Sequence, residues 1–400
     1  MMTARGSGRR LGAALLGAVL TLVVMPSTAH AIPAWARKYN VNCTQCHFPV
    51  PPVLNSDGLR FKWAGYRMPD EIGKPMEATK IGDYLASHGM LLYTWTKTSG
   101  QPSDSNSVSV PSASIFAAGP LGKWFGGFLE VEAAPDGVGV LASAQGTWGH
   151  EDSWGSVRIV QGHLISEGAV AGFDRPIGIL TPLPIDGTIG SAIPFGFGDH
   201  NGVDASWVFD QKDRLAVGVV NSMDPVFGGG TPHQRVDAFV SNQFLWDELG
   251  GGLNITGYYG NAQGVDSLYL DNNSSYYRVG VSANHYFGMF EAIGGYVYGK
   301  DMGLPVGDMF TASSATGQAY WLGAQYTFKK QYLSFYGRWE FVDPNTSVGD
   351  DGLTRWVFGA AAPLMTPQYL YVNLEYFHDQ LQLTGSPNRQ GLYVALQMAY

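Results

Sequence analysis

The strongest constraint on the fold of this chain is an alternation of apolar and polar residues along its C-terminal part. In residues 333–341, 370–377 and 392–400, nearly every second residue is apolar, and the residues between them are mainly polar or small. Successive side chains of a β-strand point to opposite faces, so a period of two indicates strands with one apolar and one polar face.

The composition narrows the kind of β-protein. Only 14% of the residues are charged, yet no apolar run of 18 residues follows the N-terminal segment; the chain has 53 Gly, 21 Tyr, 20 Phe and 11 Trp. A transmembrane β-barrel has this composition because only every second residue of a strand faces lipid. A soluble β-sandwich would also explain the alternation.

The connections favour the barrel. Sixteen candidate strands begin near residues 90, 108, 123, 139, 154, 201, 214, 234, 252, 274, 289, 316, 331, 352, 367 and 389. Short links, such as residues 210–213, alternate with long ones, such as residues 165–200. Outer-membrane barrels have short periplasmic turns and long extracellular loops, and an even strand number leaves both termini in the periplasm. The sequence therefore predicts an all-β barrel of about sixteen strands over residues 87–400.

Residues 1–31 have the features of an export signal. Arg5, Arg9 and Arg10 are followed by an apolar run at 11–25, too short to span a bilayer, and by an A-x-A site at 29–31. Without these three arginines, the chain has 21 basic and 33 acidic residues. This net negative charge argues against nucleic acid as a partner.

The only two cysteines, Cys43 and Cys46, are followed directly by His47. C-x-x-C-H is the attachment signature of a c-type haem: the thiols bond to the haem vinyl groups and the histidine is the proximal iron ligand. A redox-active pair needs no such histidine, and half a zinc site would need two further ligands. Because an export signal lies upstream, the motif predicts one covalent haem c in an oxidising compartment.

Residues 32–86 are expected to form a small helical unit around this haem. Trp35, Tyr39 and Cys43 recur every four residues, which predicts a helix over residues 34–47. Such a unit is too small to bury a haem alone, so we expect the barrel to complete the pocket.

A second short helix is predicted after Asn55, which can cap it, with Gly65 as its end. Its Leu59, Phe61 and Ala64 could cover one face of the porphyrin. The candidate haem pocket therefore comprises Trp35, Tyr39 and Phe61.

No motif fixes the distal iron ligand. Met68 lies 21 residues after His47, and a thioether raises the haem potential relative to a second histidine. We favour Met68, but Met76 and His88 are also within reach, and a ligand from the barrel or no protein ligand at all remain open.

Residues 33–39 and 43–47, followed by Leu54-Asn55, Gly58, Phe61 and Gly65-Tyr66, resemble the fused monohaem cytochrome–porins of the outer membrane, the family that includes the iron oxidases of iron-oxidising bacteria. Family members often have Phe where Trp35 stands, and the barrel matches in size and type only. The resemblance implies a small N-terminal cytochrome that plugs the barrel. It would carry electrons from extracellular Fe(II) to a periplasmic c-type cytochrome or another carrier.

Two functions are consistent with these features. The first is a ferrous iron:cytochrome oxidoreductase that transfers one electron through the haem. The second is a haem-plugged porin, or a conduit for another donor or for outward electron flow. No nucleophile–base constellation, phosphate loop or dinucleotide fingerprint stands out.

Carboxylates in the long connections could attract hydrated iron as hard oxygen ligands, or could serve solubility alone. They are Asp104, Asp174, Asp186, Asp199, Asp224, Asp266, Asp271, Asp301, Asp308, Asp343, Asp350, Asp351 and Asp379. Inside the barrel, Glu130, Glu132, Arg338 and Glu340 are expected to face the lumen. There they could line the haem or bond to one another and to water.

Overall fold

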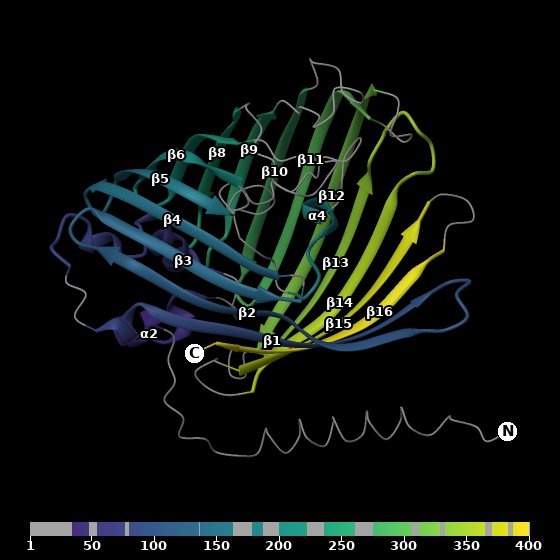
Figure 1. Cartoon of the computed structure of the whole chain (residues 1–400), viewed down its shortest axis with the longest axis horizontal. Coiled ribbons are helices and arrows are strands. Elements are labelled where there is room, and N and C mark those ends of the chain that lie inside the picture. Colours follow the sequence, from purple (N-terminus) through teal and green to yellow (C-terminus); the bar gives the residue numbers. More distant parts are fainter. Residues whose placement is uncertain are drawn as a thin grey trace.

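The computed structural model describes residues 34–47, 54–76, 80–135, 137–162, 178–186, 200–221, 236–260, 275–305, 312–328, 333–364, 370–382 and 387–399. Sixteen antiparallel strands form a closed barrel, in which each strand pairs with its neighbours in sequence (Figure 1). The strands are β1 (Leu85–Thr98), β2 (Ser105–Leu121), β3 (Phe125–Ala134), β4 (Gly137–Gly149), β5 (Trp154–Gly162), β6 (His200–Phe209), β7 (Asp213–Asn221), β8 (Val236–Leu245), β9 (Gly252–Gly260), β10 (Ser275–Phe287), β11 (Phe290–Pro305), β12 (Ala312–Phe328), β13 (Leu333–Asp343), β14 (Leu353–Pro363), β15 (Leu370–Leu381) and β16 (Arg389–Ala399).

The first and last strands close the barrel. β1 pairs with β16 from His88 opposite Ala399 to Thr98 opposite Arg389. The predicted barrel and its strand number are confirmed, and the β-sandwich alternative is wrong. β12 begins at Ala312, whereas the sequence placed its start near 316. The first residues of this strand are small or polar, so the apolar alternation did not reveal them.

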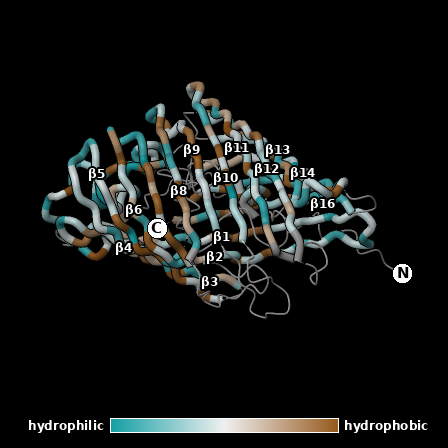
Figure 2. Tube along the Cα trace, turned by 90° about the horizontal axis from the view of Figure 1, so that it is seen from above, coloured by the Kyte–Doolittle hydropathy of each residue, from teal (hydrophilic) through white to brown (hydrophobic). Residues whose placement is uncertain are grey.

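The two faces of the wall differ as the alternation predicts. On β3, Leu129 and Val131 are 43% and 41% exposed on the outer surface, whereas Glu130 and Glu132 point inward and are half-buried. Hydrophobic and hydrophilic residues alternate along several strands in Figure 2. An apolar outer face around a barrel with no free edge is what a lipid bilayer requires.

Exposed aromatic side chains ring the end of the barrel that carries the short turns. They are Phe125, Trp148, Trp207, Phe209, Phe244, Trp246, Phe287, Phe290, Tyr326, Phe328 and Phe335. Aromatic side chains of membrane barrels gather at the level of the lipid headgroups, so this ring marks one membrane boundary. We call this end the short-turn end. Not every connection at the opposite end is long: two residues separate β3 from β4, and six separate β1 from β2 and β11 from β12, as many as in the longest connections of the short-turn end.

The N-terminal helices lie at the short-turn end, near the start of β1 and the C-terminus (Figure 1). The first, α2 (Ala34–Tyr39), is shorter than the predicted helix over 34–47, so that prediction is wrong. Asn40 adopts φ of 53°, and the amide of Val41 donates to the Ala36 carbonyl at 3.0 Å. This left-handed termination stops the helix, and the motif at Cys43 forms a separate turn, η1 (Cys43–Gln45).

The second helix, α3 (Ser56–Trp63), confirms the prediction. The Asn55 side chain accepts a hydrogen bond from the Gly58 amide, and Gly65 has φ of 80° directly after the helix. Leu59 and Ala64 pack with barrel residues, whereas Phe61 belongs to a different cluster. The expectation that all three cover one porphyrin face is therefore wrong.

Three further short elements are η2 (Pro69–Glu71), η3 (Ile81–Asp83) and α4 (Leu183–Asp186). Within the described ranges, no helix combines the length and apolar character needed to cross a membrane.

The outward position of Leu129 can be tested by Leu129→Arg. An arginine on the lipid face costs about 2–4 kcal/mol near the bilayer midplane. We therefore expect denaturant titration in lipid vesicles to show a loss of that size, whereas Glu132→Arg, which points into the lumen, should change the unfolding free energy by less than about 1 kcal/mol. Equal losses for the two variants would contradict the assignment of faces.

Candidate haem-attachment site

Residues 43–47, which we call the attachment turn, form one compact helical turn. The amide of Cys46 donates to the Cys43 carbonyl at 3.2 Å, and the amide of His47 donates to the same oxygen at 2.9 Å. Residues three and four apart lie on the same side of such a turn, so the backbone brings Cys43, Cys46 and His47 together. Both cysteines are free thiols; Cys43 is buried and Cys46 is partly buried.

The environment of the thiols is unlike that of a redox-active cysteine pair. Burial raises the pKa of the Cys43 thiol, and burial together with Asp57 and Cys43 raises the pKa of the Cys46 thiol to about 12. Redox-active thiols instead have lowered pKa values, because the thiolate is the nucleophile.

The described part of the chain contains no group of three or more His, Cys, Asp or Glu side chains that could hold a metal ion. A c-type haem does not need such a group, because its thioether bonds are made to carbon and only the histidine reaches iron. Two free thiols on one turn, followed by a histidine, therefore fit covalent haem attachment. Cys43 and Cys46 would hold the haem, and His47 would be the proximal ligand.

The start of α3 packs directly on the attachment turn. The Asn55 side-chain amide donates to the carbonyls of Thr44 and Gln45 at 3.2 and 3.0 Å, and its backbone amide donates to the Cys46 carbonyl at 2.9 Å. A Cβ atom on Gly58 would lie 2.3 Å from the Cys46 carbonyl oxygen, so this approach requires glycine. The sequence predicted Asn55 as a helix cap but gave no sign of its contacts with the turn.

The structure brings the three predicted pocket residues together. The Trp35 and Phe61 rings lie 5.2 Å apart, and those of Tyr39 and Phe61 lie 5.9 Å apart. The cluster also contains Tyr66, which stacks on Trp35, and Phe128 of β3, which stacks on Tyr66. The barrel thus contributes to this cluster, although its role as a haem pocket stays a prediction.

The candidate distal ligands lie in different places. Met68 packs in the aromatic cluster, and its backbone amide donates to Glu71 Oε2, which also accepts from the Tyr39 hydroxyl at 2.7 Å. Met76 is partly buried beyond η2. His88 belongs to β1, with Nε2 3.3 Å from Gln397 Oε1. The identity of the distal ligand stays a prediction.

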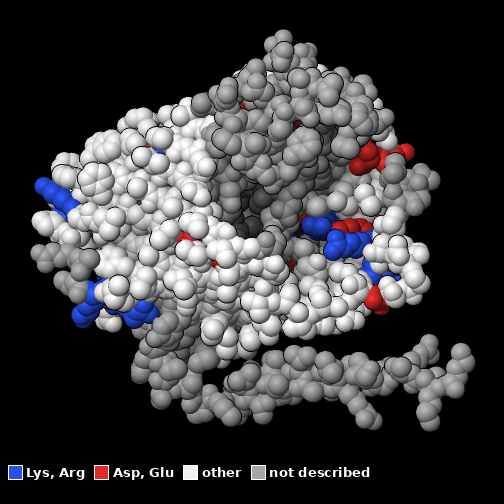
Figure 3. Space-filling view, viewed as in Figure 1, with Lys and Arg blue, Asp and Glu red and all other residues white. Residues whose placement is uncertain are grey.

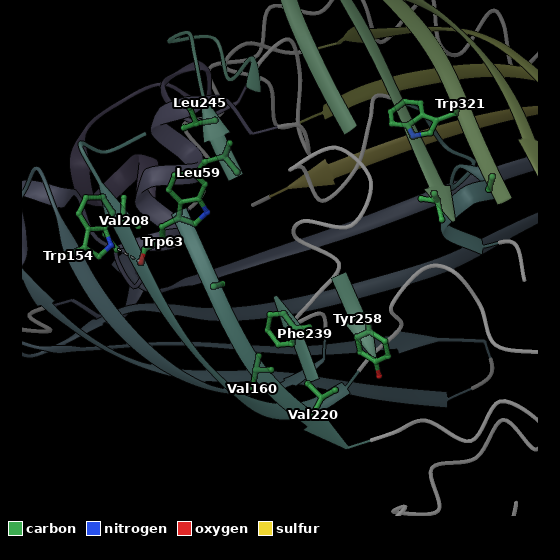
Figure 4. Close-up of a cluster of buried hydrophobic side chains, with 14 of the residues drawn as sticks. Leu59, Trp63, Trp154, Val160, Val208, Val220, Phe239, Leu245, Tyr258 and Trp321 are labelled. Atoms are coloured by element: carbon green, nitrogen blue, oxygen red, sulfur yellow. Dashed lines mark hydrogen bonds between the residues drawn. The ribbon is translucent and has the colours of Figure 1, made fainter. Parts of the chain in front are cut away.

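Buried contacts join the end of α3 to the barrel. The Trp63 carbonyl accepts hydrogen bonds from Gln145 Nε2 at 2.7 Å and from Trp154 Nε1 at 3.2 Å. Figure 4 shows Leu59 and Trp63 beside Trp154 and Leu245. Leu59 and Trp63 therefore pack into the same apolar cluster as the barrel wall.

Arg67 makes a second attachment. This side chain is fully buried, and its guanidinium donates to the carbonyls of Gly122, Lys123 and Phe125, in and beside the turn between β2 and β3. Arg60 similarly donates to the Gln211 carbonyl at 3.0 Å and pairs with Glu248 at 2.9 Å. The partners belong to three short connections, so the N-terminal unit lies across the short-turn end of the barrel.

Inside the barrel, buried arginines pair with buried carboxylates. The shortest N–O distances are 2.8 Å for Arg158–Asp204, 2.6 Å for Arg278–Asp301, 2.6 Å for Arg338–Glu340 and 2.7 Å for Arg355–Asp379. Arg338 and Glu340 thus bond to each other, one of the two alternatives left by the sequence. Asp301 and Asp379 were predicted as loop carboxylates, which is wrong: both lie in strands and pair with arginine.

Residues 178–186, which include α4, lie inside the barrel against its wall (Figure 1). The amides of Ile179 and Leu180 donate to the Glu375 carboxylate, and the amide of Leu183 donates to Glu340 Oε2 at 2.7 Å. Arg338 in turn donates to the Leu180 carbonyl at 2.8 Å. Arg338 and Glu340, which pair with each other in the wall, therefore also hold this segment in the lumen, together with Glu375. The face shown in Figure 3 is hollowed near its centre.

The other predicted iron-attracting carboxylates are only partly described. Asp104 is exposed and accepts a hydrogen bond from Trp95 Nε1 at 3.1 Å. Asp343 ends β13, Asp350 and Asp351 follow it, and Asp186 ends α4. The remaining six lie outside the described residues: Asp174, Asp199, Asp224, Asp266, Asp271 and Asp308.

No protein-family model matches the chain, and no curated protein matches it. Several solved structures share its fold. An anion-selective porin from Comamonas acidovorans is 12% identical, with a TM-score of 0.52 over 79% of this chain and 99% of that chain. The outer membrane channel DcaP of Acinetobacter baumannii is 10% identical, with a TM-score of 0.55 over 79% and 97%. OmpT, an outer membrane protein of Vibrio cholerae, is 11% identical, with a TM-score of 0.52 over 79% and 97%.

At such low sequence identities, the likeness to these structures shows a shared fold and nothing further. The chain has the architecture of bacterial outer-membrane porins: a closed antiparallel barrel of sixteen strands. Each of the three structures is covered almost completely by part of this chain.

The attachment by Arg67 predicts a local effect of Arg67→Met. Removing the guanidinium leaves the carbonyls of the β2–β3 connection without their donor, and hydrogen bonds to a charged group contribute about 1.5–3 kcal/mol each. We expect residues 34–84 to be cleaved much faster by protease while the barrel keeps its compact migration in unheated gels. Arg67→Lys, which retains the charge but fewer donors, should be intermediate. Unchanged cleavage of Arg67→Met would show that this contact does not hold the unit.

Proposed function

We propose that this protein is an outer-membrane c-type cytochrome that transfers electrons across the membrane. In this proposal, extracellular Fe(II) is the donor and a periplasmic c-type cytochrome or another periplasmic carrier is the acceptor. The haem, when bound, supplies the one-electron chemistry. The chain's own residues hold the haem at the short-turn end, which would face the periplasm.

The observation that carries the proposal is the position of the attachment turn. Cys43, Cys46 and His47 lie in a unit that is joined to the barrel by buried hydrogen bonds at Trp63 and Arg67. A haem attached there would sit at one end of a membrane-spanning barrel. That arrangement allows charge to cross a layer that ions do not readily pass.

The two sides of the lumen favour different roles. Asp204, Asp301, Glu340 and Asp379, on β6, β11, β13 and β15, are buried and pair with arginines. Glu130 and Glu132 on β3 are partly exposed. We propose that a hydrated cation passes along the β3 side, because partly exposed carboxylates can attract it without the cost of full desolvation.

A second candidate function is a conduit for a different donor or for outward electron flow. The porin fold supports this candidate equally well, because the barrel does not set the direction of electron flow. The two functions differ in whether Fe(II) reduces the oxidised protein or the reduced protein passes electrons to an Fe(III) acceptor.

Stopped-flow absorbance of purified, detergent-solubilised protein separates these functions. We expect Fe(II) to reduce the oxidised protein in a second-order reaction whose rate rises with Fe(II) concentration. No reduction by Fe(II), together with rapid oxidation of the reduced protein by an Fe(III) chelate, would support the conduit for outward flow and contradict iron oxidation.

The proposed route predicts that Glu132→Gln slows this reaction several-fold. Removing one negative charge lowers the local cation concentration, and the effect should shrink as salt screens the remaining charges. Glu151→Gln is a matched control, because Glu151 is exposed in a short turn at the other end. Equal rates for both variants at low salt would contradict a route along β3.

A further inference from the structure

We propose that the barrel turn at residues 246–251 is a positioning element of the haem-attachment site and acts through Asn55. This inference rests on the proposed haem at Cys43 and Cys46. The attachment turn, the start of α3 and this barrel turn are linked by direct contacts, so the barrel determines how the haem-bearing backbone is held.

Asn55 is the centre of the linkage. Its side-chain amide donates to two carbonyls of the attachment turn, while its side-chain oxygen accepts from the Gly58 amide at 3.0 Å. Its backbone amide donates to a third carbonyl, that of Cys46. One residue thus both caps α3 and fixes three consecutive carbonyls of the attachment turn, those of Thr44, Gln45 and Cys46.

The barrel turn lies directly against Asn55. Gly250 has φ of 98°, and a Cβ atom there would lie 3.0 Å from the Asn55 Cα atom and 3.2 Å from the Leu54 carbonyl oxygen. The next residue, Ser56, is the first of α3, and its hydroxyl donates to the Asp247 carbonyl at 2.6 Å. The barrel turn therefore contacts the chain on both sides of Asn55.

The barrel turn is itself fixed. Asp247 Oδ1 accepts from the amides of Leu249 and Gly251 at 2.9 and 2.7 Å, and the amide of Gly252 donates to the Asn284 side chain of β10 at 3.0 Å. A displacement of Asn55 would have to move a turn that is held by its own hydrogen bonds and by the next strand. The barrel consequently restrains the position of the attachment turn through Asn55.

The first test uses Asn55→Asp and Asn55→Ser. Both residues cap helices about as well as Asn, so α3 should persist. Asp, ionised, has no donor for the Thr44 and Gln45 carbonyls, and the shorter Ser hydroxyl cannot replace the two amide donors. We expect the haem reduction potential to shift by an amount equal to a several-fold change in the one-electron equilibrium constant, with altered visible absorption bands. Ser adds no charge, so a shift in both variants cannot be an effect of charge alone.

The second test moves the barrel turn instead of Asn55. Gly250→Ala places a methyl group against Asn55, whereas Gly288, in the next short turn, also has a positive φ, 67°, but open space around its Cβ position. Both glycines have positive φ, where an added Cβ atom strains the backbone, so Gly288→Ala controls for a substitution in a positive-φ turn that makes no contact with Asn55. We expect only Gly250→Ala to shift the haem potential and absorption bands, with both barrels folded in unheated gels.

The outcomes separate this inference from the function on which it rests. If the unsubstituted protein carries no covalent haem, the proposed function fails. If it carries haem and the Asn55 and Gly250 variants keep its potential and absorption bands, the function stands and the positioning role is wrong. A change in thermal midpoint without a change in potential would likewise assign these residues a structural role only.

Discussion

The structure depends on one constraint: a backbone that crosses lipid must satisfy every amide and carbonyl within the protein. A single sheet meets it by closing, and the pairing of β1 with β16 removes the last free edges. Closure then fixes the rest of the design. Side chains alternate between lipid and lumen, so the polar half of every strand is gathered inside, where charged residues must be paired or hydrated. The Arg278–Asp301 pair, with both side chains fully buried, shows the outcome.

The N-terminal unit and the barrel complete each other. The unit is too short to bury an aromatic cluster and a haem by itself, and Phe128 of the barrel extends that cluster. In return, Trp63 and Arg67 satisfy polar groups at the short-turn end of the barrel. These contacts are mostly between side chains and backbone carbonyls, which hold position without demanding a particular partner side chain. The resulting unit places Cys43 and Cys46 at the membrane boundary that is marked by the aromatic ring.

Much of this could be predicted from sequence, because it follows from local rules. The period of two identified the strands, and Asn55 and Gly65 correctly marked the ends of α3. The extent of α2 could not be predicted from apolar spacing, since Asn40 ends the helix through a backbone conformation that leaves the apolar stripe intact. Long-range partners also could not be predicted from the sequence: nothing near Asp301 shows that it lies in a strand and pairs with Arg278 of the neighbouring strand rather than in a loop. For the same reason, the contacts of Asn55 with the attachment turn could not be predicted from the sequence.

The central claim is that the barrel carries a covalently bound haem at Cys43 and Cys46. The most direct measurement is mass spectrometry of the denatured, proteolysed protein, purified from outer membranes of cells that can mature c-type cytochromes. The account predicts a peptide containing residues 43–47 whose mass is increased by one haem, linked through both cysteines. Recovery of that peptide only with unmodified thiols, or with a disulfide between them, would contradict the account.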